Sequence, residues 1–284
     1  RTIPVNAQLQ GVYYWTFIEG QLGAMQWIAA PLWLLGLFYL LFSRQGKTLR
    51  FFGWFFFIVF FLLLFLKAKH YYLFGVYPFL LAAGAYAYES RLSKRYQYYL
   101  YAYLPLIWIM GMLSMPNGTP FLPIETYLEY SGLAETKESN GRVTGLSSDY
   151  ADMFGWEKQV DQVLRIYQSL DTQEQEVCII WADNYGEAGA INYFGSRQGL
   201  PPATSRHGSF YLWGPGEASG QVAITLGIEN KEWIASYYQE IIEVDHIFHP
   251  YAVDEEVNVP IYLCRKPRRL LKDHWAALRP YVFD

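Results

Sequence analysis

This sequence has few cysteines and no excess of positive charge. Its 284 residues include 2 cysteines, Cys178 and Cys264, which lie in or at the end of apolar runs. We expect both thiols to be free, because two distant cysteines give neither a disulfide framework nor the ligand spacing of a zinc site. The formal net charge is −4 and no basic stretch dominates, so the composition excludes a nucleic-acid-binding surface.

Charge is also missing from long stretches of the first 115 residues. Apolar runs without any Asp, Glu, Lys or Arg occupy residues 27–42, 51–66, 72–88 and 99–115. Each run approaches the ~20 residues that cross ~30 Å of hydrocarbon, and aromatic flanks extend it. The sequence therefore predicts a membrane region over residues 1–115 with about four transmembrane helices. An interfacial helix is expected within residues 1–26, where aromatic residues surround Glu19.

Beyond residue 115 charged and polar residues recur every few positions. A Pro- and Gly-rich start predicts a linker over residues 116–150. Helical spacing follows at 156–170 and near 231–238, and buried-strand patterns follow at 177–182, 221–226, 241–248 and 259–264. Strands that alternate with helices predict a soluble α/β domain over residues 151–284 with a largely parallel sheet.

The loops between the apolar runs indicate an orientation. Arg44, Lys47 and Arg50 lie in one loop, and a second loop at residues 89–98 carries Arg91, Lys94 and Arg95. Positive charge is enriched in cytoplasmic loops, so we expect both loops inside. The protein is then a multi-pass protein of the plasma (inner) membrane, with its C-terminal domain on the extracytoplasmic side.

A basic loop, residues 67–72 (KAKHYY), separates two of the apolar runs on the expected outer side. One interpretation is interfacial anchoring, since lysine and tyrosine favour the headgroup depth. The other is that Lys67 and Lys69 bind a lipid phosphate, with Tyr71 and Tyr72 adding hydroxyl hydrogen bonds. His70 is a hydrogen-bonding neighbour in either case, because a lone histidine beside lysines makes no metal site.

Several separated motifs resemble one family. They are KAKHYYLFGVYPFLLAAGA at 67–85, ADMFGWE at 151–157, NYGEAGAINYFG at 184–195 and WGPG at 213–216. In this order they resemble the C-terminal part of bacterial integral-membrane glycosyltransferases of the GT-C type. These are related to dolichyl-phosphate-mannose protein mannosyltransferases and to the aminoarabinose transferase of lipid A. One departure is Gly75, where relatives often have proline.

The resemblance implies transfer of a sugar from a polyprenyl-phosphate donor in the membrane lipid to an extracytoplasmic acceptor, without a cofactor or metal. It places Lys69 first, and Lys67 second, at the lipid phosphate. The family's catalytic acidic residue belongs to an outer loop that has no counterpart here, so we expect no catalytic residue in this chain. The chain begins on Arg1, and we expect it to be part of a longer protein.

The soluble half offers possible sugar or acceptor contacts at Asn184, Glu187, His207 and Trp213. A structural interpretation stands beside this one. Asn184 and Glu187 have the spacing of a capping box, and the aromatic loop at 207–216 is also typical of a cover over a sheet edge. The alternative function is a membrane-anchored sugar- or lipid-binding accessory protein without catalysis. A transporter is disfavoured because the apolar runs lack ionisable residues.

The loop charges predict an outcome for labelling of intact cells. A single cysteine introduced near Glu138 should react with an impermeant maleimide, because the soluble domain is expected outside. A cysteine near Lys47 should be protected. The reverse pattern would invert the topology and remove the argument that the basic loop faces outward.

Overall fold

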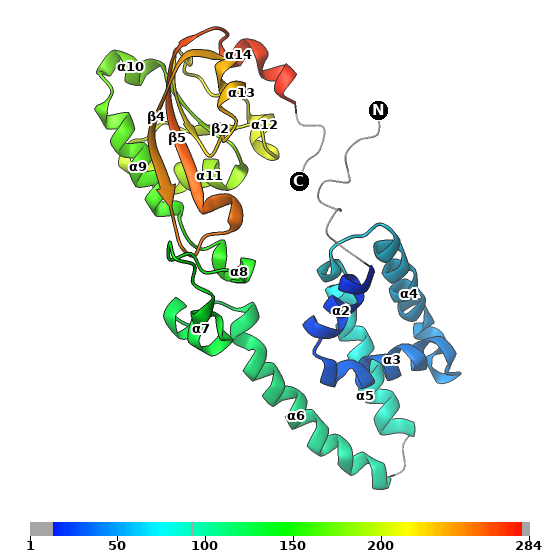
Figure 1. The fold of residues 1–284 in the computed structure, drawn as a ribbon. Helices are drawn as coiled ribbons and strands as arrows, with labels where there is room; N and C mark the ends of the chain where they lie inside the picture. Colours follow the sequence, from blue (N-terminus) through cyan, green and yellow to red (C-terminus); the bar gives the residue numbers. More distant parts are fainter. Residues whose placement is uncertain (1–13, 92–93, 280–284) are drawn as a thin grey trace. The chain divides into compact units, whose positions relative to one another are not determined.

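The structure is a computed structural model that describes residues 14–91 and 94–279. Its contacts divide the chain into two units, Arg1–Pro116 and Asn117–Asp284 (Figure 1). The first unit is helical. The second holds a mixed sheet between helices, so the chain as a whole is mostly helical with one five-stranded sheet.

The first unit consists of helices joined by short 3₁₀ segments. The helices are α2 (Tyr14–Ala24), α3 (Ala30–Phe42), α4 (Arg50–Phe65), α5 (Tyr77–Arg91) and α6 (Lys94–Gly118). The 3₁₀ segments are η1 (Trp27–Ala29), η2 (Gln45–Leu49) and η3 (His70–Val76). The helix α2 lies within the region where we predicted an interfacial helix, and residues 1–13 of that region lie outside the described residues.

Two helices of the described chain are long and apolar enough to cross a membrane, Gln45–Phe65 and Tyr98–Gly118. The pair Tyr14–Ala24 and Trp27–Phe42 adds a third candidate if its 81° bend belongs to one span. The predicted run at 72–88 is interrupted, because η3 occupies its start and α5 begins only at Tyr77. Pro78 fits that start, since a first helical turn does not need its N–H. The expected four spans are therefore not confirmed.

The helices α3 and α5 approach each other with no side chain between their backbones. A Cβ on Gly36 would lie 1.9 Å from the carbonyl oxygen of Leu80, and a Cβ on Gly84 would lie 2.0 Å from that of Leu32. Small residues permit such contact between apolar helices. The crossing places Trp33 against Tyr77, with ring centroids 5.3 Å apart, in the core of this unit.

The second unit begins with the helices α7 (Ile124–Ser131), which lies within the predicted linker, and α8 (Ser148–Ala151), which crosses its predicted end at residue 150. Five strands follow: β1 (Cys178–Ala182), β2 (Ala203–Ser205), β3 (Val222–Leu226), β4 (Tyr238–Phe248) and β5 (Asn258–Pro267). The remaining helices are α9 (Trp156–Ser169), α10 (Thr172–Val177), α11 (Tyr185–Ala190), α12 (Ser209–Trp213), α13 (Lys231–Ala235) and α14 (Leu271–His274). A π-helical turn, Ile191–Gly195, continues α11.

The sheet is mixed, with strand order β2-β1-β3-β5-β4, and the prediction of a largely parallel sheet is wrong for one half of it. The strand β1 is parallel to β2 and β3, whereas β5 is antiparallel to β3 and β4. The reason is the connection from β4 to β5, which holds only a 3₁₀ turn at Asp254–Glu256. Parallel neighbours require a crossover of a dozen or more residues, usually a helix.

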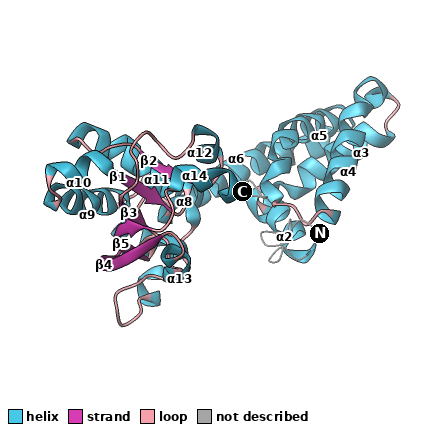
Figure 2. Cartoon of the chain, turned by 90° about the horizontal axis from the view of Figure 1, so that it is seen from above, coloured by secondary structure: helices cyan, strands magenta, loops and turns pink. Residues whose placement is uncertain are grey.

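Helices cover both faces of this sheet, which explains why every residue of β1 and β3 is buried and why Thr225 is the single polar residue of these two strands (Figure 2). Ile180 and Ala182 face a core that includes Val160 of α9 and Ile191. Trp181 faces the second core, on the side of α13 and α14. Strands buried on both faces lose the alternation of polar and apolar residues. Cys178 lies in β1 and Cys264 in β5, and both thiols are buried and free.

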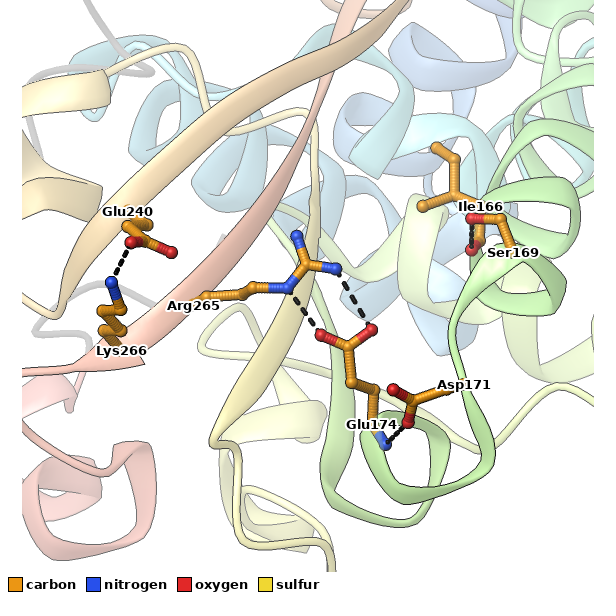
Figure 3. Close-up of polar contacts among 7 residues, drawn as sticks. All are labelled: Ile166, Ser169, Asp171, Glu174, Glu240, Arg265 and Lys266. Carbon is orange, nitrogen blue, oxygen red and sulfur yellow. Dashed lines mark hydrogen bonds and ion pairs between the residues drawn. The ribbon is translucent and has the colours of Figure 1, made fainter.

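A two-point ion pair fixes α10 against the sheet (Figure 3). The Nε of Arg265 on β5 lies 2.6 Å from Oε1 of Glu174, and its second guanidinium nitrogen lies 3.1 Å from Oε2. Asp171 caps the same helix by accepting from the N–H of Glu174 at 2.8 Å. The chain is thereby held in place just before β1, the strand that leads to Asp183 and Asn184.

The contact between α3 and α5 generates a stability prediction. Gly84→Val should destabilise the protein by about 1 to 3 kcal/mol, because the new side chain meets backbone atoms that cannot yield. The measurement is the thermal midpoint of the detergent-solubilised protein. Gly23→Ala is the matched control, since nothing lies within 4 Å of a Cβ there. Equal midpoints for both variants would contradict the described crossing.

Candidate functional site

The basic loop lies where α4 ends. Lys67 has φ of 52°, a left-handed conformation that stops the helix. Lys69 is extended, with φ −66° and ψ 137°, and η3 starts directly after it. Both lysines are exposed, as are Tyr71 and Tyr72, at 45% and 61%. The four residues predicted to bind a lipid phosphate therefore lie together on one exposed segment.

A buried glutamine holds this loop in place. Gln21 of α2 is 2% exposed and donates from Nε2 to the carbonyl oxygen of His70 at 2.7 Å. Its Oε1 accepts from the hydroxyl of Tyr77 at 2.8 Å. Gly20 permits this approach, because a Cβ there would lie 2.6 Å from Cγ of His70. Gln21 was not predicted from the sequence. An amide residue within an aromatic helix could have indicated a buried hydrogen-bonding position.

The lysine side chains face aromatic rings. Nζ of Lys67 lies 6.0 Å from the ring centroid of Tyr14, and Nζ of Lys69 lies 5.9 Å from that of Tyr71. In the part of the chain that the structure describes, no carboxylate forms an ion pair with either lysine. Two cations beside the C-terminal end of α4 also suit the negative end of the helix dipole. Chemically, they offer two point charges and tyrosine hydroxyls to an anion.

In the second unit, the predicted capping box is confirmed. Oδ1 of Asn184 accepts from the N–H of Glu187 at 3.0 Å, and Oε2 of Glu187 accepts from the N–H of Asn184 at 3.2 Å. The same Oε2 accepts from the N–H of Asp183 at 2.9 Å. The box therefore fixes the turn that leads from β1 into α11.

A second buried carboxyl group shares Asn184. Nδ2 of Asn184 donates to Oε1 of Glu256 at 2.7 Å, and Nε2 of Gln159 donates to Oε2 of Glu256 at 2.7 Å. Glu187 is 1% exposed and Glu256 is 3% exposed. Burial raises the pKa of Glu187 well above its ordinary value, and Glu256 raises it further. Burial raises the pKa of Glu256 too, against the hydrogen bonds from Asn184 and Gln159.

This burial defines what Glu187 does. Its Oε1 lies so close to Gly227 that a Cβ there would be 1.8 Å away. The carboxyl group is enclosed by Gly227 on one side and by backbone amides on the other, so it serves the fold rather than a ligand at the surface. Asn184 is partly exposed, but both ends of its amide are used within the network.

His207 and Trp213, the other predicted contacts, lie beyond the end of β2. The N–H of His207 donates to Oγ of Ser205 at 3.1 Å, and its ring meets that of Tyr185 with centroids 4.8 Å apart. Trp213 ends α12 and is 71% exposed. The structure thus brings His207 beside the start of α11. No group of three His, Cys, Asp or Glu that could hold a metal occurs among the described residues.

Comparison with known proteins yields no relative. No family model matches the sequence, and neither a curated protein nor a solved structure matches it significantly. The resemblance to membrane glycosyltransferases therefore stays a prediction from the motifs quoted above.

The buried carboxyl pair predicts a pH-dependent local stability. The pKa of Glu187 is raised on folding, so the stabilisation is present below the ordinary value of 4.5 and is lost as pH rises through the raised pKa. Amide exchange at Asp183 and Asn184, corrected for intrinsic rates, should therefore quicken as pH rises from about 4.5.

Glu187→Gln should flatten this dependence, since a neutral amide does not ionise. Glu157→Gln is the control, because Glu157 is an exposed glutamate of α9 and should leave the pH profile unchanged. A profile that is steep in Glu187→Gln as well would show that Glu187 is not the responsible group.

Proposed function

We propose that this chain is the C-terminal portion of a membrane glycosyltransferase that moves a sugar from a polyprenyl-phosphate donor to an extracytoplasmic acceptor. In this proposal the basic loop binds the lipid phosphate. The observation that carries it is the placement of Lys67 and Lys69, exposed and without an ion-pair partner among the described residues, at the end of the apolar helix α4.

The physical argument concerns the leaving group. When the glycosidic bond breaks, negative charge develops on the phosphate, and cations already fixed beside it stabilise that transition state. The hydrogen bonds of Gln21 to His70 and Tyr77 fix the loop before any lipid arrives. Pre-positioned charges of this kind do not have to reorganise during the reaction, which is why they are effective.

A lipid headgroup also requires an apolar surface for its chain. The helix α4 exposes large apolar side chains toward its end, namely Ile58, Phe61, Leu62 and Phe65, and Leu66, the residue after the helix, is also exposed. A polyprenyl chain along this surface would place its phosphate near the lysines. An ordinary phospholipid has the same two parts, so the experiment has to compare the two lipids.

The test measures binding of undecaprenyl phosphate to the detergent-solubilised protein by native mass spectrometry. Lys69→Gln should weaken binding about 10- to 100-fold, the range for a hydrogen bond to a charged group. Lys69→Arg should recover it in part, because a planar fork replaces a compact ammonium. In the enzyme that carries these residues, Lys69→Gln should lower sugar transfer about 100- to 1,000-fold.

Lys47→Gln is the matched control, since Lys47 is an exposed lysine in η2, before the opposite end of α4. Undecaprenol, which lacks the phosphate, and phosphatidylglycerol should bind weakly and equally to all variants. Unchanged binding in a Lys67→Gln, Lys69→Gln double variant would leave the loop as a membrane anchor. Strong binding without any effect on sugar transfer would favour the accessory-protein alternative.

A further inference from the structure

The strand order of the second unit creates a switch point between β1 and β3. The chain leaves β1 and returns as β2 on one side, and the next parallel strand, β3, lies on the other side of β1. In open α/β sheets, ligands bind beyond the carboxyl ends of the strands at such a point. Here that position is marked by Asp183, whose N–H donates to the carbonyl oxygen of Leu226 at 2.9 Å.

Three charged side chains gather at this point. Asp183 follows β1, Arg206 follows β2 and Glu229 follows β3 by three residues. Among the described residues, none of these three side chains has a hydrogen bond or an ion pair. Asp183 keeps solvent contact, although partial burial raises the pKa of its carboxyl group while Arg206 and His207 oppose the rise.

Aromatic rings frame the same position. The guanidinium of Arg206 lies 4.8 Å from the ring centroid of Trp233 on α13. Since Arg206 follows β2 and Trp233 follows β3, the stacked pair bridges the end of β1, which lies between those strands. Tyr185, the first residue of α11, is 55% exposed, and its ring centroid lies 4.8 Å from that of His207.

We infer that this switch point, formed by Asp183, Arg206, Glu229, Trp233 and Tyr185, is a binding site for a neutral pyranose sugar. Sugar hydroxyls both donate and accept, so they match two carboxylates beside one guanidinium. The apolar face of a pyranose ring packs on an aromatic ring. The two carboxylates would repel an anion, and the guanidinium of Arg206 would repel a cation. The mixed charge therefore favours a neutral polyhydroxylated ligand.

The sugar-binding residues inferred from the structure differ from those predicted from the sequence. Asn184 and Glu187 stabilise the turn through the capping box. Their neighbours Asp183 and Tyr185 are exposed and are therefore the residues available to a ligand. The inference does not rest on the proposed transfer reaction, because sugar binding at this unit is measured without turnover and without the basic loop. Variants of Lys67 and Lys69 test the proposed transfer function, and variants of Asp183 and Arg206 test the sugar site.

The test uses saturation-transfer-difference NMR on the whole chain in detergent, with methyl α-D-mannopyranoside and methyl β-D-glucopyranoside as probes. At least one pyranoside should receive saturation, strongest on the protons of one ring face. Arg206→Gln and Asp183→Asn should each weaken binding about tenfold or more, because each removes a charged hydrogen-bonding group. Among the described residues the side chain of Asp183 makes no hydrogen bond or ion pair, so Asp183→Asn should unfold at the wild-type temperature.

Arg197→Gln is the matched control. Arg197 also stacks on an exposed aromatic ring, with its guanidinium 5.5 Å from the centroid of Tyr193, but that pair lies in the turn after α11 and away from the switch point. This variant should keep full binding, and acyclic mannitol should show none.

Two results would overturn the inference. The first is equal saturation, or none, in the wild type and in all three variants. The second is displacement of the pyranoside by inorganic phosphate together with stronger phosphate binding in Asp183→Asn, which would make the switch point an anion site.

Discussion

An amide side chain with both ends hydrogen-bonded holds each of the two candidate sites. Gln21 joins the carbonyl of His70 to the hydroxyl of Tyr77 in the first unit, and Asn184 joins an amide of the α11 turn to Glu256 in the second. Neither interaction is strong by itself, since an intramolecular hydrogen bond contributes about 0.5 to 1.5 kcal/mol. Breaking one, however, leaves buried polar atoms without partners, so the bridged segments move only together.

The parts of the fold that sequence predicted well are those set by local patterns. The strand at Cys178–Ala182 is continuous in apolar residues, and Asn184 with Glu187 forms a capping box from its spacing alone. The strand Ala203–Ser205 was not predicted, because three residues after two prolines carry no periodic signal. The direction of β5 was also not predicted, because it depends on how β4 turns back and not on the composition of either strand.

The candidate sites show the same division. Lys67, Lys69, Tyr71 and Tyr72 are neighbours in sequence, so their proximity in space was predictable. The contact of Arg206 with Trp233 was not predictable, because it depends on the order of β1, β2 and β3 in the sheet. Sequence reasoning selected His207 and passed over the adjacent Arg206. Without strand order, no pattern distinguishes an arginine above a switch point from one on any solvated loop.

The contact of α3 with α5 has a mechanical consequence for the basic loop. Backbone meets backbone at Gly36 and Gly84, so neither helix has a flexible side chain that could absorb a small displacement of the other. The loop continues through η3 directly into α5. A displacement of Lys69 that reaches α5 is therefore transmitted to α3, because no side chain lies between the two backbones at Gly36 and Gly84.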